Sequence, residues 1–164
     1  MEVRAQFPDE QSPAGEFARQ PDVFRRWVTA DGSSDYPAAA GRYHLYVSWA
    51  CPWAHRTIIV RTLKKLETVI GMTVVDPIRD ERGWAFREGA GHSPDPINGF
   101  QFLREAYKAT DPTYIGRITV PVLWDSVTKR IVTNSDDDLM RIFNGEFNRF
   151  TESPIDLYPD GLRQ

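Results

Sequence analysis

The spacing of hydrophobic residues along the chain predicts its first elements. A run of apolar and aromatic residues over 42–48 is typical of a strand. A helix is expected next, over about 53–67, because apolar residues recur there at helical spacing. A second short strand, 72–76, ends before Pro77, which has no N–H to donate to a neighbouring strand. A strand, a helix and another strand in this order predict a crossover between parallel strands.

A long loop and a second helix are expected next. Residues 77–98 show no regular period, and structureless loops of this length inside a compact domain are often functional. Trp84 stands out in this loop, because a tryptophan beside a glycine and charged residues either completes the core or lines a site. The helix that follows starts at Asn98 or Gly99 and reaches about Ala109.

The last third of the pattern predicts a hairpin and a third helix. Residues 118–124 read as a strand interrupted by a proline, which belongs at a sheet edge or where the chain leaves the ladder. Residues 130–133 return as the hairpin partner. Asn134 or Ser135 then caps a helix through about Asn144, whose first turn holds three aspartates where the helix dipole favours negative charge.

The element order β-α-β-α-β-β-α predicts an α/β fold, namely a thioredoxin-like four-stranded mixed sheet with flanking helices. We assign residues 42–145 to this domain. Residues 1–41 are expected to form an irregular arm docked on the domain, with a short helical turn near Pro21–Trp27. Residues 146–164 read as a polar linker or tail.

Composition and charge narrow the function. The chain has 164 residues, 41% hydrophobic residues and a net charge of −3, which suit one globular domain and favour neither a nucleic acid nor a membrane as partner. One cysteine excludes an internal disulfide, and the first residues lack the apolar core of a signal peptide. The three histidines show no metal-ligand spacing. We therefore expect a cytoplasmic protein of a reducing compartment, without a metal.

The single cysteine, Cys51, follows the first strand and begins the first helix. The unpaired N–H groups and the helix dipole at such a position favour the thiolate over the thiol, and Pro52 suits the first helical residue. A lone cysteine is more often a small buried hydrophobe, so it is the strand-to-helix setting that indicates a reactive thiol. His55, one turn on, either supports the thiolate or is a surface residue.

The block Ala50-Cys51-Pro52-Trp53-Ala54-His55-Arg56-Thr57 and its flanks resemble the glutathionyl-hydroquinone reductases, which are the Xi class of glutathione transferases. The resemblance covers roughly residues 20–160 and continues at 76–78, 83–84, 97–100, 119–125 and 131–134.

The resemblance implies a mechanism and a site. Cys51 would attack the sulfur of a glutathionyl-hydroquinone, form a mixed disulfide with glutathione and release the hydroquinone, and a second glutathione would clear the enzyme. Trp84 would stack against the bound thiol, the backbone of Val120 would pair with its cysteinyl part, and Pro121 would hold that strand end. A fold of this kind places the Val120–Pro121 bond opposite Cys51, where a cis form is expected.

Two departures from the family pattern bear on the ligand. The family usually has Glu-Ser, which grips the γ-glutamyl group, where this chain has Ser135 and Asp136. Asp136 can bind an ammonium group but repels a ligand carboxylate, so glutathione and another low-molecular-weight thiol, such as mycothiol, both stay open. The family also has a helical C-terminal domain that supplies the quinone pocket and most of a homodimer contact. These 164 residues do not include it, so we expect weak quinone chemistry and a homodimer only where that domain is present.

Two other functions stay open. A general monothiol, glutaredoxin-like oxidoreductase that removes glutathione from mixed disulfides needs only the thioredoxin-like domain. A non-catalytic binding domain would be marked by a thiol that is neither acidic nor accessible.

Overall fold

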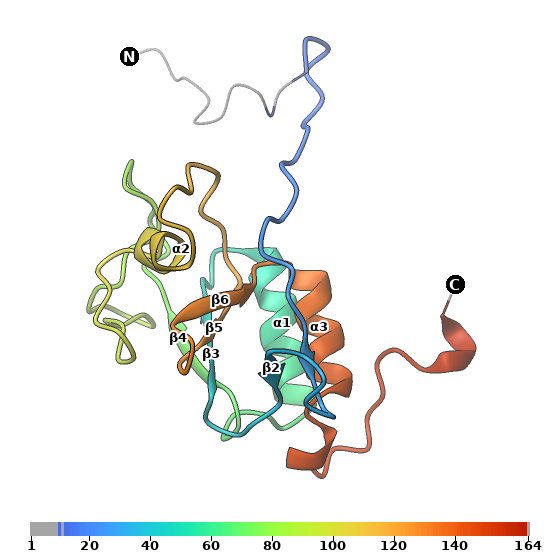
Figure 1. Cartoon of the computed structure of the whole chain (residues 1–164). Coiled ribbons are helices and arrows are strands. Elements are labelled where there is room, and N and C mark those ends of the chain that lie inside the picture. The colour runs from blue at the N-terminus through green and yellow to red at the C-terminus, as the bar shows by residue number, and fades with distance from the viewer. Residues whose placement is uncertain (1–9, 11, 164) are drawn as a thin grey trace.

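A mixed four-stranded sheet lies at the centre of the computed structural model, which describes Glu10 and residues 12–163 (Figure 1). In chain order the elements are β1 (Val28–Thr29), β2 (Tyr36–Pro37), β3 (Tyr43–Val47), α1 (Pro52–Leu63), β4 (Gly71–Val74), α2 (Arg104–Thr110), β5 (Val122–Asp125), β6 (Arg130–Thr133), α3 (Asp136–Gly145), and two short 3₁₀ turns, η2 (Asn148–Phe150) and η3 (Asp160–Leu162).

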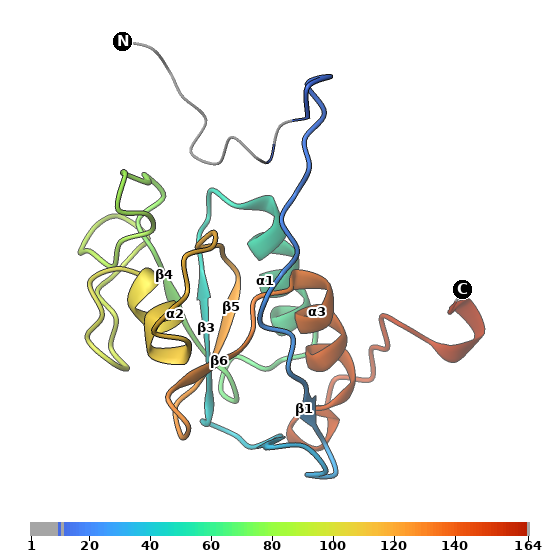
Figure 2. The same cartoon turned by 45° about the horizontal axis from the view of Figure 1, so that its top comes forward.

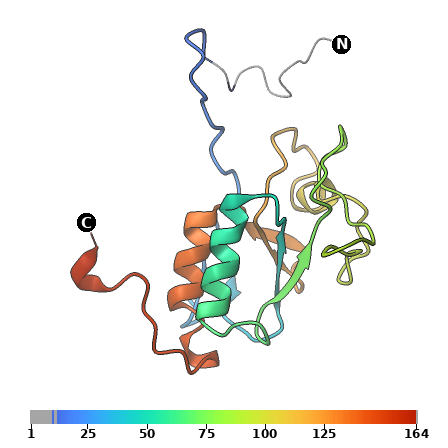
Figure 3. The same cartoon turned by 180° about the vertical axis from the view of Figure 1, so that it is seen from behind.

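The strand order in the sheet is β4-β3-β5-β6. β3 runs parallel to β4 and antiparallel to β5, and β5 pairs antiparallel with β6. α1 and α3 lie side by side on one face of the sheet, and α2 lies on the other (Figures 1, 2 and 3). This arrangement confirms the expected thioredoxin-like α/β fold. Among the described residues, no helix combines the length and hydrophobicity that a membrane crossing requires.

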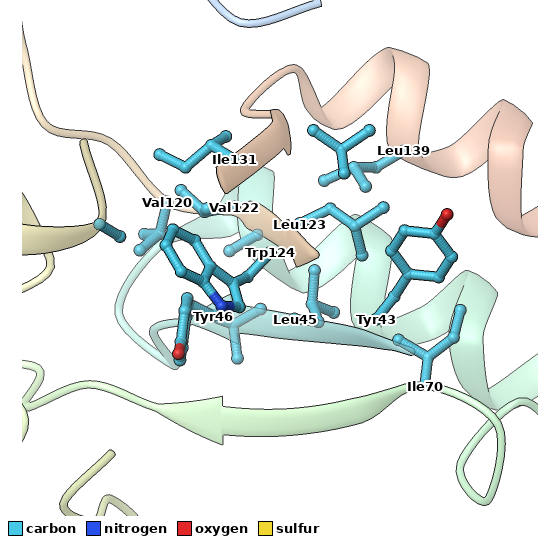
Figure 4. Close-up of a cluster of buried hydrophobic side chains, with 14 of the residues drawn as sticks. Tyr43, Leu45, Tyr46, Ile70, Val120, Val122, Leu123, Trp124, Ile131 and Leu139 are labelled. Carbon is cyan, nitrogen blue, oxygen red and sulfur yellow. The ribbon is translucent and has the colours of Figure 1, made fainter. Parts of the chain in front are cut away.

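The core fills the space between the sheet and the helices. All five residues of β3 are buried, which agrees with a central strand covered on both faces. Its side chains pack with those of the neighbouring strands and of α3, as Figure 4 shows for Leu45, Leu123, Trp124 and Leu139. The sheet therefore holds β3 rigidly up to Val47, four residues before the cysteine.

Two predicted helix boundaries are wrong. α1 ends at Leu63 and not near residue 67, because Lys65 adopts a φ of 53° and the N–H of Leu66 bonds back to the carbonyl of Arg61, which closes the helix. Leu66 keeps its expected burial through this turn.

α2 begins at Arg104 and not at residue 98 or 99. The Asp95 carboxylate accepts hydrogen bonds from the N–H groups of residues 97, 98 and 100, and Glu105 accepts those of residues 101 and 102. These side chains satisfy the backbone donors outside a helix, so the segment forms a loop.

The helical turn expected near Pro21–Trp27 is also wrong. Residues 24–26 are extended and run antiparallel to the end of β6: Arg26 N donates to Val132 O, and Asn134 N donates to Phe24 O. This segment covers the free edge of β6, which would otherwise expose unpaired backbone groups.

Residues 146–158 lie against the domain. Phe147 is fully buried and contacts the rings of Tyr43 and Phe143, and the Lys64 ammonium donates to the carbonyl of Ile155 at 2.7 Å. The division of the chain at residues 41 and 145 remains a prediction, but the core extends at least to Phe147.

Candidate active site

Cys51 is the N-cap residue of α1. Its backbone is extended (φ −105°, ψ 112°), and its carbonyl accepts the first helical hydrogen bond from His55 N at 3.0 Å. The sulfur caps none of the helical N–H groups, and it lies 3.6 Å from the carbonyl oxygen of Val120, to which the thiol can donate. The side chain is half-buried, so the sulfur is supported by the fold and open to a small molecule.

A cavity of about 150 Å³ opens beside this sulfur. Its walls come from five parts of the chain: the N-terminal segment, the start of α1, the loop after β4, the stretch before β5 and the residue after β6. The residues that argue for function there are Cys51, Trp53, Trp84, Val120, Asn134 and three arginines, Arg19, Arg79 and Arg117. One thiol, two indole rings and three guanidinium groups thus line the same cavity.

The Val120–Pro121 bond is cis, as expected, and lies next to Cys51. Tyr107 and Asn134 hold the preceding residue: the Tyr107 hydroxyl donates to Thr119 O at 2.9 Å, and Asn134 Nδ2 donates to Thr119 Oγ1 at 3.2 Å. β5 starts only at Val122, so Val120 is outside the ladder and its backbone borders the cavity.

Trp84 takes both of the roles between which the sequence left a choice. Only 9% of its surface is exposed, and it packs on the core cluster while its ring also borders the cavity. Its carbonyl accepts from Leu103 N at 2.9 Å, and the Arg79 guanidinium lies 5.1 Å from the ring centroid. Trp84 is therefore held in place at the wall of the cavity.

The charged side chains of the cavity wall are mainly cationic. Arg19, Arg79 and Arg117 line it, while Asp22 is the one acidic side chain among the described lining residues. Arg19 pairs with Asp22 at 3.0 Å, and Arg117 forms an ion pair with Glu10. Burial, and then the nearby charge of Arg117, lower the pKa of Arg79. An anionic ligand would relieve this crowding of positive charge.

Ser135 and Asp136 lie outside the cavity wall. The Ser135 hydroxyl accepts from Asp138 N at 3.4 Å as the cap of α3. The Asp136 carboxylate pairs with Arg56 Nη1 of α1 at 2.7 Å. Burial raises the pKa of Asp136, and the Arg56 charge opposes this shift. His55 is exposed and also lies outside the wall.

Sequence reasoning missed Asn134 and the arginines as site residues. The sequence suggests Asn134 as a helix cap, yet it also borders the cavity, and its Oδ1 accepts from Phe24 N at 3.1 Å. The arginines come from separate stretches, and nothing local marks them. Within the described part of the chain, no group of three or more histidine, cysteine, aspartate or glutamate side chains is placed to hold a metal ion.

The comparisons with known proteins agree with this geometry. No protein-family model matches the chain. It is 43% identical over 155 residues to the glutathionyl-hydroquinone reductase PcpF of Sphingobium chlorophenolicum, covering 94% of this chain and 48% of that protein. The crystal structure of the glutathione-S-transferase Xi from Phanerochaete chrysosporium superposes with a TM-score of 0.86 at 44% identity, over 90% of this chain and 51% of that one. Over about half of their length, this chain is similar to glutathionyl-hydroquinone reductases and to Xi-class glutathione transferases.

A third similar protein has a structure with glutathione bound. The glutathione-bound structure of YqjG, a glutathione transferase homologue from Escherichia coli K-12, matches with a TM-score of 0.82 at 44% identity, over 85% of this chain and 48% of that chain. The chain spans about half the length of the Xi-class relatives that it matches. The comparisons therefore extend over the described thioredoxin-like fold and leave about half of each of these relatives unmatched.

Proposed function

We propose that this protein is a thiol-dependent reductase that removes glutathione, or a similar low-molecular-weight thiol, from glutathionyl-hydroquinones through a mixed disulfide on Cys51. The observation that carries the proposal is the position of Cys51 at the N-terminus of α1, with its sulfur at the mouth of a cavity and 3.6 Å from the Val120 carbonyl. The positive end of the helix favours the thiolate, which is the nucleophilic form.

Charge and backbone geometry support a peptide-like anionic thiol as the ligand. Glutathione carries two carboxylates, and the cavity beside the sulfur is lined by Arg79 and Arg117. Within the described part of the chain, the Val120 N–H donates to no other group, so it is available to a ligand backbone that lies along this strand end. Trp84 offers a fixed indole face to the same ligand. The proposal places the cysteinyl part of the ligand between Val120 and Trp84.

The proposed reaction has two steps. The Cys51 thiolate attacks the sulfur of the conjugate, an S–S bond forms, and the bond between sulfur and the ring carbon breaks. The electron pair of that bond stays on the carbon, which takes up a proton and leaves as the hydroquinone. A second glutathione thiolate then attacks the glutathionyl sulfur, which regenerates the Cys51 thiolate and releases oxidised glutathione. The conjugate is reduced by two electrons, and the free thiol supplies them.

Substrate preference tests this proposal. We expect release of hydroquinone from a glutathionyl-hydroquinone at a rate well above that of free glutathione at the same pH. The measurement is the initial rate of hydroquinone formation, with hydroxyethyl disulfide as a parallel substrate.

The pattern of the two rates separates the alternatives. Turnover of the simple disulfide without turnover of the conjugate would contradict the proposal and indicate a general monothiol oxidoreductase. A failure to turn over either substrate, with a thiol that resists alkylation, would indicate a binding domain.

A further inference from the structure

The N-terminal segment 17–22, here called the strap, borders the Cys51 cavity although nothing in its sequence marks it as part of a site. Phe17, Arg19, Gln20, Pro21 and Asp22 all contribute to the wall. In all three views the segment passes beside the N-terminal end of α1, where Cys51 lies (Figures 1, 2 and 3). The strap therefore lies where a molecule that reacts with Cys51 must approach.

The strap is anchored directly after its last residue. Two hydrogen bonds, each 3.1 Å long, join Phe24 to Asn134. The Phe24 N–H donates to Oδ1 of Asn134, and the Asn134 N–H donates to the Phe24 carbonyl. Arg25 makes a two-point ion pair with Asp138, at 2.8 and 2.6 Å. Between residues 17–22 and the described residues beyond 23, no backbone hydrogen bond is formed. The strap is thus anchored just beyond this end and forms no strand-like pairing with the described part of the domain.

Arg19 is the side chain that joins the strap to the reactive end of α1. Its guanidinium lies 5.8 Å from the ring centroid of Trp53, two residues after Cys51, and 3.0 Å from Asp22 on the strap itself. About two fifths of the Arg19 side chain is exposed, so a ligand can still reach its remaining donors. Arg19 thus brings a positive charge to the cavity that Arg79 and Arg117 also line.

We propose that the strap forms part of the substrate site and that Arg19 is a specificity-determining residue, which selects substrates carrying a negative charge close to the reacting sulfur. The inference rests on the function proposed for Cys51 and adds to it the residue that selects the charge of the substrate. If Arg19 only docked the strap on Trp53, its replacement would change the reaction rates of charged and neutral substrates alike.

Two aromatic disulfides, one negatively charged and one neutral, test the role of Arg19. Dithiobis(nitrobenzoate) is a dianion, and dithiodipyridine is neutral at the same pH. Each forms a mixed disulfide with the Cys51 thiolate and releases one leaving group that is followed by absorbance, the thionitrobenzoate thiolate or, after uptake of a proton, thiopyridone. Arg19→Gln is expected to slow the reaction with the dianion about 3- to 10-fold, which is the order of magnitude for removing one charge close to a dianion in a largely aqueous setting. The reaction with the neutral disulfide should change little.

Two further variants make the result specific. Arg19→Lys retains the charge and should recover most of the preference for the dianion. Arg163→Gln makes the same change in net charge on the C-terminal tail, remote from the strap, and should leave the ratio of the two rates unchanged (Figure 1). Raising the salt concentration should reduce the wild-type preference, because exposed charges are screened over about 10 Å at 0.1 M.

The proposal for Arg19 would be overturned if Arg19→Gln left the ratio of the rates with the dianionic and the neutral disulfide at its wild-type value, whether or not both rates fall. A wild-type Cys51 that reacts with the neutral disulfide no faster than free cysteine would instead contradict the function proposed for Cys51. The ratio between the two reagents would still decide the role of Arg19, so the two failures are distinguishable.

Discussion

Cys51→Ala is expected to lower the turnover of a glutathionyl-hydroquinone by on the order of 10³-fold or more, to the background rate of the thiol in solution. The reason is that Cys51 is the one cysteine of the chain, so no second thiol can replace it as nucleophile or resolve its mixed disulfide. The measurement is the initial rate of hydroquinone release at fixed glutathione concentration.

The fold of the Cys51→Ala variant should be intact. The side chain is half-buried, its sulfur caps no helical N–H group, and truncation removes a single heavy atom. We expect a change in the free energy of unfolding of below about 1 kcal/mol. Cys51→Ser provides the matched control, since it restores the size of the side chain with a far weaker nucleophile and should be as inactive. Wild-type turnover by either variant would show that the mechanism is wrong.

Arg42→Ala is expected to have the largest effect on stability, about 3–5 kcal/mol, because it leaves a buried carboxylate without its cation. Arg42 precedes β3 and Asp125 ends β5, and two bonds join them, Nε to Oδ1 at 2.8 Å and Nη2 to Oδ2 at 2.7 Å. Asp125 is fully buried, and the side chain of Arg42 is 14% exposed. The measurement is urea unfolding at pH 7, with Arg130→Ala as the control. Arg130 is the exposed ladder partner of Asp125, and its loss should cost no more than about 0.5 kcal/mol.

The effect of Arg42→Ala should depend on pH with a definite sign. Burial alone would raise the pKa of Asp125, but the bonds from Arg42 and Thr128 outweigh it, and the pKa is lowered overall. In the wild-type protein, the ionised Asp125 therefore contributes to the free energy of unfolding above the pKa of this group in the unfolded chain, which is about 4. That contribution is lost as the pH falls through the pKa of Asp125 in the folded protein. Without Arg42, burial raises the folded pKa, so the variant loses stability as the pH rises. The difference between the two proteins should shrink as the pH falls below about 5. A difference that stays constant from pH 7 to pH 4 would contradict this explanation.

The parts of the fold that sequence reasoning predicted correctly depend on local signals. The strand–Cys51–Pro52–helix junction needs only a hydrophobic run, a proline and a helical period, all within about twenty residues. The Ser135 cap of α3 and the break in the strand at Pro121 are equally local. Such features do not need knowledge of distant contacts, so the element order and the place of the thiol followed from the sequence.

The parts that it missed depend on distant partners. Residues 24–26 pair with residues more than a hundred positions away, and this pairing replaced the expected helical turn with an extended strand edge. The start of α2 was misplaced because Asp95 and Glu105 satisfy backbone donors through their side chains. The cationic wall likewise joins arginines from three stretches, and no local pattern reveals that they face one cavity.

The formation of the mixed disulfide tests the central claim most directly. The wild-type protein is mixed with one equivalent of a glutathionyl-hydroquinone, without free glutathione, and is measured by mass spectrometry of the intact chain and of its peptides. We predict one glutathionyl group on Cys51 for each hydroquinone released. Release of hydroquinone from a protein whose Cys51 stays unmodified throughout the reaction would contradict the claim.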